Sequence, residues 1–526
     1  MATAGLASLF VCYDQLYGAD SIQCGATPPN AATIDRGMKW LEKNFAASFN
    51  PSAVQSMHYH LYGVERVALA SGYKYFGGIE WYRHGTKILL GPGAGVQWGS
   101  IWEPAYTILF LARGRNPVLF NKLKRPGDWN NRPRELAHLT RWVSRTLERQ
   151  IGWQIVDVDS ESTDWHDAPI LYISGSKAPT FTDAQVARLQ RYVREGGTIF
   201  SVAECGGEAF RSGMRKLYAK LFPDGEITLA PKTHEIYNKD AGFPMPAGPP
   251  MYVVTNGVRV LAYHSDQDLA LDWQTNKHVS RPESFQVSFN IARLVTGEVK
   301  LMRHRAQSHW PDAKVLAAAA PAAAPLKLAR LRFAGNADPE PLALERFRQV
   351  MAVHDALSVE IVGPIPIDQL AAQKVRFAHL AGVGPLNLSA AEIAALKAFV
   401  EGGGTLLIEA IGASAPFAQQ AEKLIPAICP GRPLVDLPAD NEMMKLPELE
   451  IKSVTYAPRT TKRLGRTPEM PLLKAVLFDD VPRLYLSRED VTTALLGCPY
   501  ASLDGYSSRS ALCLLRNMLS LACRGK

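Results

Sequence analysis

The spacing of apolar residues divides the chain into a helical beginning and a longer region of alternating strands and helices. In the first 115 residues, apolar side chains recur every three or four positions, which is the period of one helix face. Ile34, Met38 and Leu41 show this spacing, and Thr33 stands where the N-cap of that helix is expected. The same spacing predicts further helices over 57–70, 79–90 and 103–112.

From about residue 117 onward, short apolar runs typical of buried strands alternate with segments of helical spacing. Thr182 is the expected N-cap of one of these helices. Strict alternation of strands and helices favours a doubly wound α/β domain with a parallel sheet. The runs predict strands over 118–123, 154–158, 170–173, 198–202 and 258–263, and helices over 134–150 and 183–194.

An internal repeat shows that this α/β region consists of two similar halves. Residues 182–210 align with residues 389–417 without a gap, so that YVREGGTI stands over FVEGGGTL. Residues 265–269 match 487–491, and residues 119–124 match 327–332. The sequence therefore predicts a tandem duplication, with copy one at 116–312 and a degenerate copy two at 326–526.

The boundary between the two copies is marked by composition. All ten tryptophans lie at or before Trp310, and an Ala/Pro tract follows over 316–325. Such a tract cannot build a core, so we interpret 313–325 as a semi-rigid linker. The predicted order is a helical part at 1–115, copy one, this linker and copy two.

Composition and charge exclude several classes of protein. An apolar fraction of 47% and a charged fraction of 21% over 526 residues are ordinary for folded domains. We expect no membrane span, because no run approaches the roughly 18 apolar residues that one needs. A net charge of +8 without a Lys/Arg block gives no reason to expect nucleic-acid binding.

The cysteines and the first residues indicate no metal and no particular compartment. Seven cysteines without a C-x-x-C pair do not resemble a disulfide framework or a zinc ribbon, so we expect neither a metal nor a cofactor. The first residues lack the basic region of a signal peptide and look like the inside of a helix, as though sequence preceded them. The compartment stays open.

The helical part resembles the repeat of the squalene-cyclase and prenyltransferase α/α-toroid. The residues that carry this resemblance are Gly37–Leu41 (GMKWL) and Gln97–Trp102 (QWGSIW), a degenerate Gln-Trp motif. The resemblance implies part of a toroid, because about 115 residues are too few to close one. The family's acidic D-x-D-D motif and its zinc ligands are absent, so terpene chemistry is not expected and the helical part is interpreted as a surface for a protein partner.

The two α/β copies are similar to the domain-of-unknown-function 4159 family. The carrying segments are Asp167–Gly175 (DAPILYISG), Tyr192–Thr198 and Ala203–Gly207 (AECGG). The resemblance implies a class I glutamine-amidotransferase-like fold of the flavodoxin type and implies no particular reaction. The predicted fold class is thus a partial α/α-toroid followed by two doubly wound α/β domains.

One turn of copy one has the residues of a nucleophilic site. Cys205 stands between a strand and a helix that starts near residue 208, where helix amides lower a thiol pKa. Glutamine amidotransferases, which the fold resembles, place their thiol at this point. The base would be His264 with Asp266 as its orienting carboxylate, and His234 is a rival base.

Other interpretations of the same turn need no catalysis. Cysteine is often a small buried apolar residue, and Glu204 opposes thiolate formation. Open α/β sheets also bind ligands at this edge whatever their chemistry. A binding site there would be formed by Glu204, Gly206 and Gly207, with Trp129 and Arg132 from the loop after the first strand. Copy two has lost every titratable candidate, because it carries Ile411, Gly412, Asn441 and Leu486 at the positions of Glu204, Cys205, His234 and His264.

Two main hypotheses for function follow. The first is a binding or scaffolding protein of bacterial type, whose ligand, a small molecule or a protein, binds at the sheet edge of copy one. The alternative is a Cys-dependent hydrolase or amidotransferase that uses Cys205 on an amide or glycan-peptide substrate. Redox sensing by Cys205 is a third class, and the lack of a second cysteine in copy one counts against it.

Overall fold

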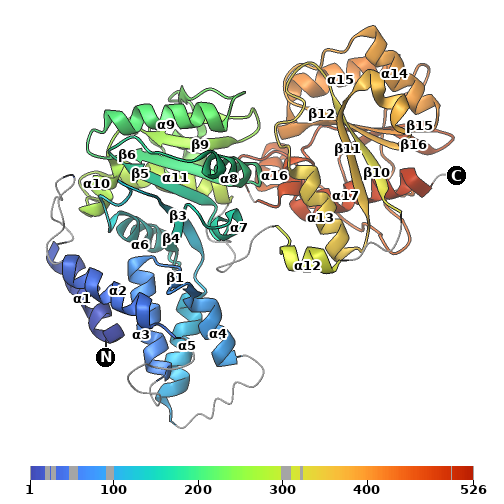
Figure 1. The fold of residues 1–526 in the computed structure, drawn as a ribbon. Helices are drawn as coiled ribbons and strands as arrows, with labels where there is room; N and C mark the ends of the chain where they lie inside the picture. Colours follow the sequence, from blue (N-terminus) through green and yellow to red (C-terminus); the bar gives the residue numbers. More distant parts are fainter. Residues whose placement is uncertain are drawn as a thin grey trace.

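A computed structural model describes residues 2–17, 24, 31–46, 57–90, 100–297, 310–319, 324–498 and 500–524. Three parts follow one another in the order of the sequence, with copy one between the helical part and copy two (Figure 1). No helix in these described ranges combines the length and the apolar character that crossing a bilayer requires.

The helical part packs its apolar faces around one small core, which includes Leu61, Val64 and Phe110. One prediction for this part is wrong: residues 79–90 do not form a single helix. Ile79–Glu80 forms strand β2, which pairs antiparallel with β1 (Tyr75–Phe76) across a two-glycine turn. Thr33 is no N-cap, because it lies inside a helix. The helices are α1 (Ala2–Tyr17), α2 (Ala31–Asn44), α3 (Met57–Ser71), α4 (Trp81–Leu90) and α5 (Trp102–Gly114).

Copy one is built on a seven-stranded sheet that is mixed rather than wholly parallel. Five strands are parallel to one another. The sixth strand runs antiparallel to the fifth, to which a short hairpin joins it, and the seventh pairs antiparallel with the sixth. The strand order is β4 (Gly152–Asp157), β3 (Val118–Lys124), β5 (Ile170–Gly175), β6 (Thr198–Ala203), β9 (Val260–Ser265), β8 (Tyr252–Thr255) and β7 (Thr228–Leu229).

Helices cover both faces of this sheet, as the alternation of elements predicts. Two apolar clusters, one on each face, fill the space between sheet and helices. One face is covered by α6 (Glu135–Leu147), α10 (Leu269–Gln274) and α11 (Pro282–Thr296), and the other by α7 (Ser162–Trp165), α8 (Asp183–Arg194) and α9 (Glu208–Leu221).

Copy two repeats this architecture, which confirms the duplication. Helices α8 and α14 both begin with a capping box, made by Thr182 with Gln185 and by Ser389 with Glu392. The strand order is β11 (Val359–Pro366), β10 (Leu326–Arg332), β12 (Phe377–Gly382), β13 (Thr405–Ala410), β16 (Val481–Ser487), β15 (Leu473–Phe478) and β14 (Val435–Asp436). The longer helices are α13 (Ala343–His354), α14 (Ala390–Glu401), α15 (Ala415–Ile428), α16 (Pro458–Leu464) and α17 (Ser508–Arg524).

Each part is joined to the next by specific contacts. The helical part extends the first sheet, because Ile155 of β4 donates a hydrogen bond to the carbonyl of Gly72 at 2.7 Å and pairs with Tyr73. The predicted linker contains a short helix, α12 (Ala313–Ala318), which buries none of its side chains. Just before it, the Trp310 indole donates to the carbonyl of Glu195, which holds the connection against copy one.

Candidate functional site

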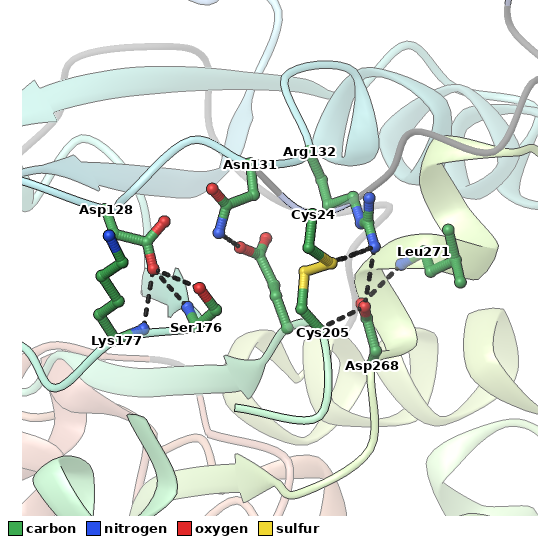
Figure 2. The surroundings of a disulfide bond; sticks show 10 residues. Cys24, Asp128, Asn131, Arg132, Ser176, Lys177, Cys205, Asp268 and Leu271 are labelled. Atoms are coloured by element: carbon green, nitrogen blue, oxygen red, sulfur yellow. Dashed lines mark hydrogen bonds and ion pairs between the residues drawn. A yellow bond between two sulfur atoms is a disulfide. The ribbon is translucent and has the colours of Figure 1, made fainter. Parts of the chain in front are cut away.

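The carboxyl ends of the parallel strands of copy one meet at one edge, where polar residues gather. Asp128, Asn131 and Arg132 follow β3, and Ser176 follows β5. The Asp128 carboxylate accepts hydrogen bonds from the backbone amides of Ser176 and Lys177 at 2.6 and 2.8 Å, which joins the first two loops (Figure 2). The candidate turn with Cys205 follows β6 at the same edge.

A disulfide links this turn to the helical part. Cys205 is bonded to Cys24, with their Cα atoms 5.8 Å apart, and the two residues are 181 positions apart in the sequence (Figure 2). The expectation of no disulfide is therefore wrong for this pair. Copy one has no second cysteine, and the helical part supplies the partner of Cys205. A single bridge between distant residues leaves no spacing pattern, which is why the sequence did not indicate it.

The backbone at Cys205 has the left-handed conformation that favours glycine. Its φ is +63°, and the equivalent Gly412 of copy two has the same φ of +63°. A non-glycine residue costs about 1–2 kcal/mol in this conformation, so copy one keeps the sulfur at an energetic cost. Close packing explains the glycine two positions later: a Cβ on Gly207 would lie 2.4 Å from the carbonyl oxygen of Ser176.

A buried arginine and an aspartate hold the disulfide in place. Nη2 of Arg132, a residue only 2% exposed, lies 3.1 Å from the Asp268 carboxylate and 3.4 and 3.7 Å from the sulfurs of Cys24 and Cys205. Asp268 accepts the Cys205 amide at 2.8 Å and that of Leu271 at 2.9 Å, as the N-cap of α10. Cys24, Cys205 and Asp268 lie close enough to share a metal ion, but here the sulfurs bind each other and a guanidinium faces the carboxylate.

Copy two shows that Asp268 is structural. Asp490, its counterpart, accepts the Gly412 amide at 2.6 Å and the Thr493 amide at 2.7 Å, although copy two has no cysteine at this turn. The aspartate therefore holds the turn in both copies, while the disulfide is a property of copy one.

Glu204 is the most unusual group at the edge. Its side chain is fully buried, and Oε2 accepts a hydrogen bond from Asn131 at 2.9 Å. Its other oxygen, Oε1, has no hydrogen-bond partner among the described residues. Burial raises the pKa of Glu204 well above its usual value, and the nearby Glu135 raises it further while Lys122 opposes the shift. The buried environment therefore favours the protonated form of Glu204.

The sequence did not indicate the buried ion pair beside Glu204. Lys122 of β3 lies 2.5 Å from the Glu135 carboxylate of α6, whose other oxygen accepts the Tyr172 hydroxyl at 2.9 Å. The Lys122 ammonium also lies 5.7 Å from the ring centre of Trp129, so Trp129 covers this pair. A lysine inside an apolar strand run was the one available signal.

The predicted base His264 is engaged elsewhere. Its Nδ1 lies 2.7 Å from the hydroxyl of Ser201, and its Nε2 lies 3.0 Å from Asp266. Burial lowers the pKa of His264, against the raising effect of Asp266, while the pKa of Asp266 falls to about 2 because hydrogen bonds from His264 and Arg215 outweigh its burial. Asp266 thus orients His264, but toward a buried serine rather than toward Cys205.

The remaining candidates lie at or near the turn without forming a catalytic set. His234 uses Nδ1 to accept the amide of Ile236 at 3.2 Å and so caps a 3-10 turn. The carbonyl of Gly206 accepts a hydrogen bond from Arg211 at 2.9 Å. Within the described ranges, neither His234 nor His264 is hydrogen bonded to Cys205.

The substitution Glu204→Gln is expected to change how stability depends on pH. A carboxyl whose pKa is raised in the folded state lowers the protein's free energy of unfolding as the pH rises above the unfolded pKa of 4.5. The loss is about 1.4 kcal/mol for each unit by which the pKa is raised. The variant should therefore gain stability relative to the native chain between pH 5 and pH 8 in urea unfolding followed by tryptophan fluorescence. Glu208→Gln, an exposed change three residues after Cys205, is the control. Equal pH slopes for the native chain and Glu204→Gln would contradict the buried-acid interpretation.

Comparison with known proteins identifies the family of the α/β part. The family described as Domain of unknown function (DUF4159) matches residues 119–292 and again residues 327–495. These stretches cover more than half of the chain and fall on the two seven-stranded sheets. No curated protein matches the chain. The chain therefore belongs to the DUF4159 family and carries two copies of its domain in tandem.

Proposed function

We propose that this protein is a non-catalytic binding or scaffolding protein whose ligand site is the sheet edge of copy one. The observation that carries the proposal is the Oε1 atom of Glu204, buried without a partner among the described residues and next to Asn131. An unsatisfied buried polar atom costs about 1–3 kcal/mol, which a bound ligand would recover. Ligands of open α/β sheets bind at this edge.

The comparison between the copies supports this choice of edge. Copy two has Ile411 where copy one has Glu204, and its edge is covered by the β8–β9 turn of copy one. Val258 of that turn lies 3.2 Å from the position of a Cβ on Gly412, and the Asn336 amide donates to the carbonyl of Asn256 at 2.8 Å. The polar groups suited to a ligand are therefore those of copy one.

The side chains at the edge favour a polar ligand with little net charge. A protonated Glu204 donates one hydrogen bond, Asn131 donates and accepts, and the Arg132 guanidinium is already balanced by Asp268. Gly206 lets a ligand approach the backbone of the turn, because, apart from Gly206 itself and its two chain neighbours, no described atom lies within 4 Å of the position of a Cβ on it. This set suits amide and hydroxyl groups, as found in a glycan-peptide.

The finer description of the fold is part of the proposal. The strand order and the antiparallel hairpin at one side of each sheet support a class I glutamine-amidotransferase-like fold. The packing of α3 against both α1 and α5 supports a toroid fragment that offers a surface to a protein partner. We divide the chain at 1–115, 116–312, 313–325 and 326–526.

The geometry supports binding better than Cys-dependent hydrolysis. A nucleophilic Cys205 requires a thiolate, whereas its sulfur is bonded to Cys24. Among the described residues, neither histidine proposed as the base is hydrogen bonded to Cys205, and both ring nitrogens of His264 are engaged by Ser201 and Asp266. Disulfides persist in oxidising compartments, so the bridge also favours an extracytoplasmic location.

The test uses N-acetylmuramyl-L-alanyl-D-isoglutamine, which carries sugar hydroxyls, peptide groups and a primary amide. Saturation-transfer NMR should detect its binding to the oxidised chain, and Glu204→Leu should weaken binding about tenfold, the effect of losing one buried hydrogen bond. Ile411→Leu, at the equivalent position of copy two, should leave binding unchanged, and near-UV circular dichroism verifies that each variant is folded.

Ammonia release from the same probe separates binding from catalysis. The proposal expects none from the oxidised or the dithiothreitol-reduced chain. Release by the reduced chain that is lost in Cys205→Ser would overturn it in favour of the hydrolase. A lack of binding in both redox states would contradict a site of this chemistry at the edge.

A further inference from the structure

A cavity lies between the helical part and copy one, apart from the disulfide edge. Its volume is about 680 Å³. Its walls are α1, α3, α6, the connection from α5 to β3 and the start of β4. Because elements of both parts form these walls, the cavity exists only when the helical part is docked on copy one.

The charge of the lining is predominantly positive. Two of its arginines, Arg134 and Arg141, are held by Asp14, which Arg134 contacts through two nitrogens at 2.7 and 2.9 Å and Arg141 at 2.9 Å. These contacts join α1 to α6 beside the cavity. The cationic lining residues are Arg66, Arg134, Arg141, Arg145 and Arg149, and the acidic ones are Asp14, Glu65 and Glu148.

Glu65 is a buried acid among the residues that line this cavity. Its side chain is fully buried on α3, and neither carboxyl oxygen has a hydrogen-bond partner among the described residues. Burial raises the pKa of Glu65 to about 7, although Arg113 and Arg66 partly oppose the shift. At neutral pH a large share of this carboxyl is therefore protonated and can donate a hydrogen bond.

Apolar side chains form much of the remaining wall. Phe10 and Trp153 present rings from α1 and β4, and the Arg134 guanidinium lies 5.4 Å from the ring centre of Phe10. This volume is within the range of small-molecule sites, which combine apolar walls with a few polar groups. The other apolar lining residues include Val11, Leu69, Val118 and Ile151.

We infer that this cavity binds an amphipathic anion, a hydrocarbon body that carries one carboxylate or phosphate group. The apolar walls hold the hydrocarbon, and the arginines that Asp14 does not engage attract the anionic group. The protonated form of Glu65 donates a hydrogen bond to an oxygen of the anion. This inference is independent of the site proposed at the sheet edge of copy one.

The test is displacement of the fluorescent probe 11-(dansylamino)undecanoate from the oxidised full chain. Decanoate and decyl phosphate should displace it, and the stronger of the two identifies the anionic group. Decanol and decyltrimethylammonium should be at least about tenfold weaker, because each lacks the charge that the arginines bind. Equal displacement by decanol and both anions would overturn the inference.

Variants then assign binding to this cavity. The double change Arg66→Ala with Arg145→Ala should weaken probe binding about tenfold, whereas Arg194→Ala, an exposed arginine on α8 outside the lining, should not. Glu204→Leu should also leave probe binding unchanged, which separates this cavity from the edge site. Probe affinity that is unchanged in the double variant would place the probe outside this cavity and overturn the inference.

Glu65→Gln provides a second readout that does not depend on those arginines. Native affinity for decanoate should fall as pH rises from 6 to 8, because Glu65 loses the proton it donates, and the variant should show no such fall. The charged groups around Glu65 include Arg66 of α3, Arg113 of α5, Asp14 of α1 and Arg134 of α6. A pH dependence that persists in Glu65→Gln would contradict the role given to Glu65.

Discussion

Removing the disulfide between Cys24 and Cys205 is expected to lower the free energy of unfolding by about 2–5 kcal/mol. The bridge closes a segment of 181 residues, and in the chain-entropy model a long closed segment stabilises the folded state most. The double variant Cys24→Ser with Cys205→Ser should unfold at lower urea concentration. Tryptophan fluorescence selectively reports on the two parts that the bridge joins, because every tryptophan lies in the helical part or in copy one.

The matched control for the disulfide is Cys12→Ser, which changes an exposed free thiol. Dithiothreitol should bring the native chain to the stability of the double variant and leave the double variant unchanged. A native chain whose unfolding is insensitive to dithiothreitol while its thiols become titratable would show that the bridge does not stabilise this arrangement.

Local sequence signals predicted the α/β architecture well. The N-cap at Thr182 and the gap-free alignment of 182–210 with 389–417 predicted two equivalent helices and the strands that follow, and the structure adds that both helices begin with a capping box. The mixed nature of the sheets escaped prediction, because neither β8, which turns back against β9 through a short hairpin, nor the two-residue β7 was recognised as a strand. The two-glycine hairpin at Gly77–Gly78 likewise interrupted a pattern that looked helical.

The candidate site was predicted only as far as it follows from strand ends. Arg132 and the turn with Cys205 were expected at one edge because parallel strands end together, and the structure brings them into contact. The partner of Cys205 was not predictable, since Cys24 belongs to another part of the chain. The role of His264 on β9 depends on Ser201, its register partner on the adjacent strand β6. No spacing in the sequence indicates this pairing.

The two copies differ in what covers their equivalent edges. The edge of copy two is covered by the β8–β9 turn of copy one, and the edge of copy one carries Cys24 of the helical part. Each part thus contacts the equivalent turn of the part that follows it, at Cys205 in copy one and at Gly412 in copy two. Gly412 suits a turn that only packs against its neighbour. Cys205 keeps a side chain whose bond to Cys24 can be broken by reduction.

Glu340→Ala is expected to lower the free energy of unfolding by about 3–5 kcal/mol, because it leaves a buried guanidinium without its carboxylate. Arg259 of copy one lies 2.7 Å from Glu340 of copy two, and both side chains are almost fully buried. The same guanidinium donates to the carbonyls of Gly197 at 3.1 Å and Val193 at 2.5 Å. These carbonyls cannot neutralise the charge that Glu340 balances.

Replacement of both partners separates this electrostatic cost from simple loss of packing. Arg259→Met with Glu340→Leu replaces the pair by apolar side chains, which is often nearly neutral, so the double variant should be more stable than Glu340→Ala. Urea unfolding followed by far-UV circular dichroism measures all variants, and Glu360→Ala, which removes an exposed ion pair with Lys327, is the control. Equal destabilisation of Glu340→Ala and the double variant would contradict this prediction. The contact between the copies would then depend on packing around the pair rather than on the ion pair itself.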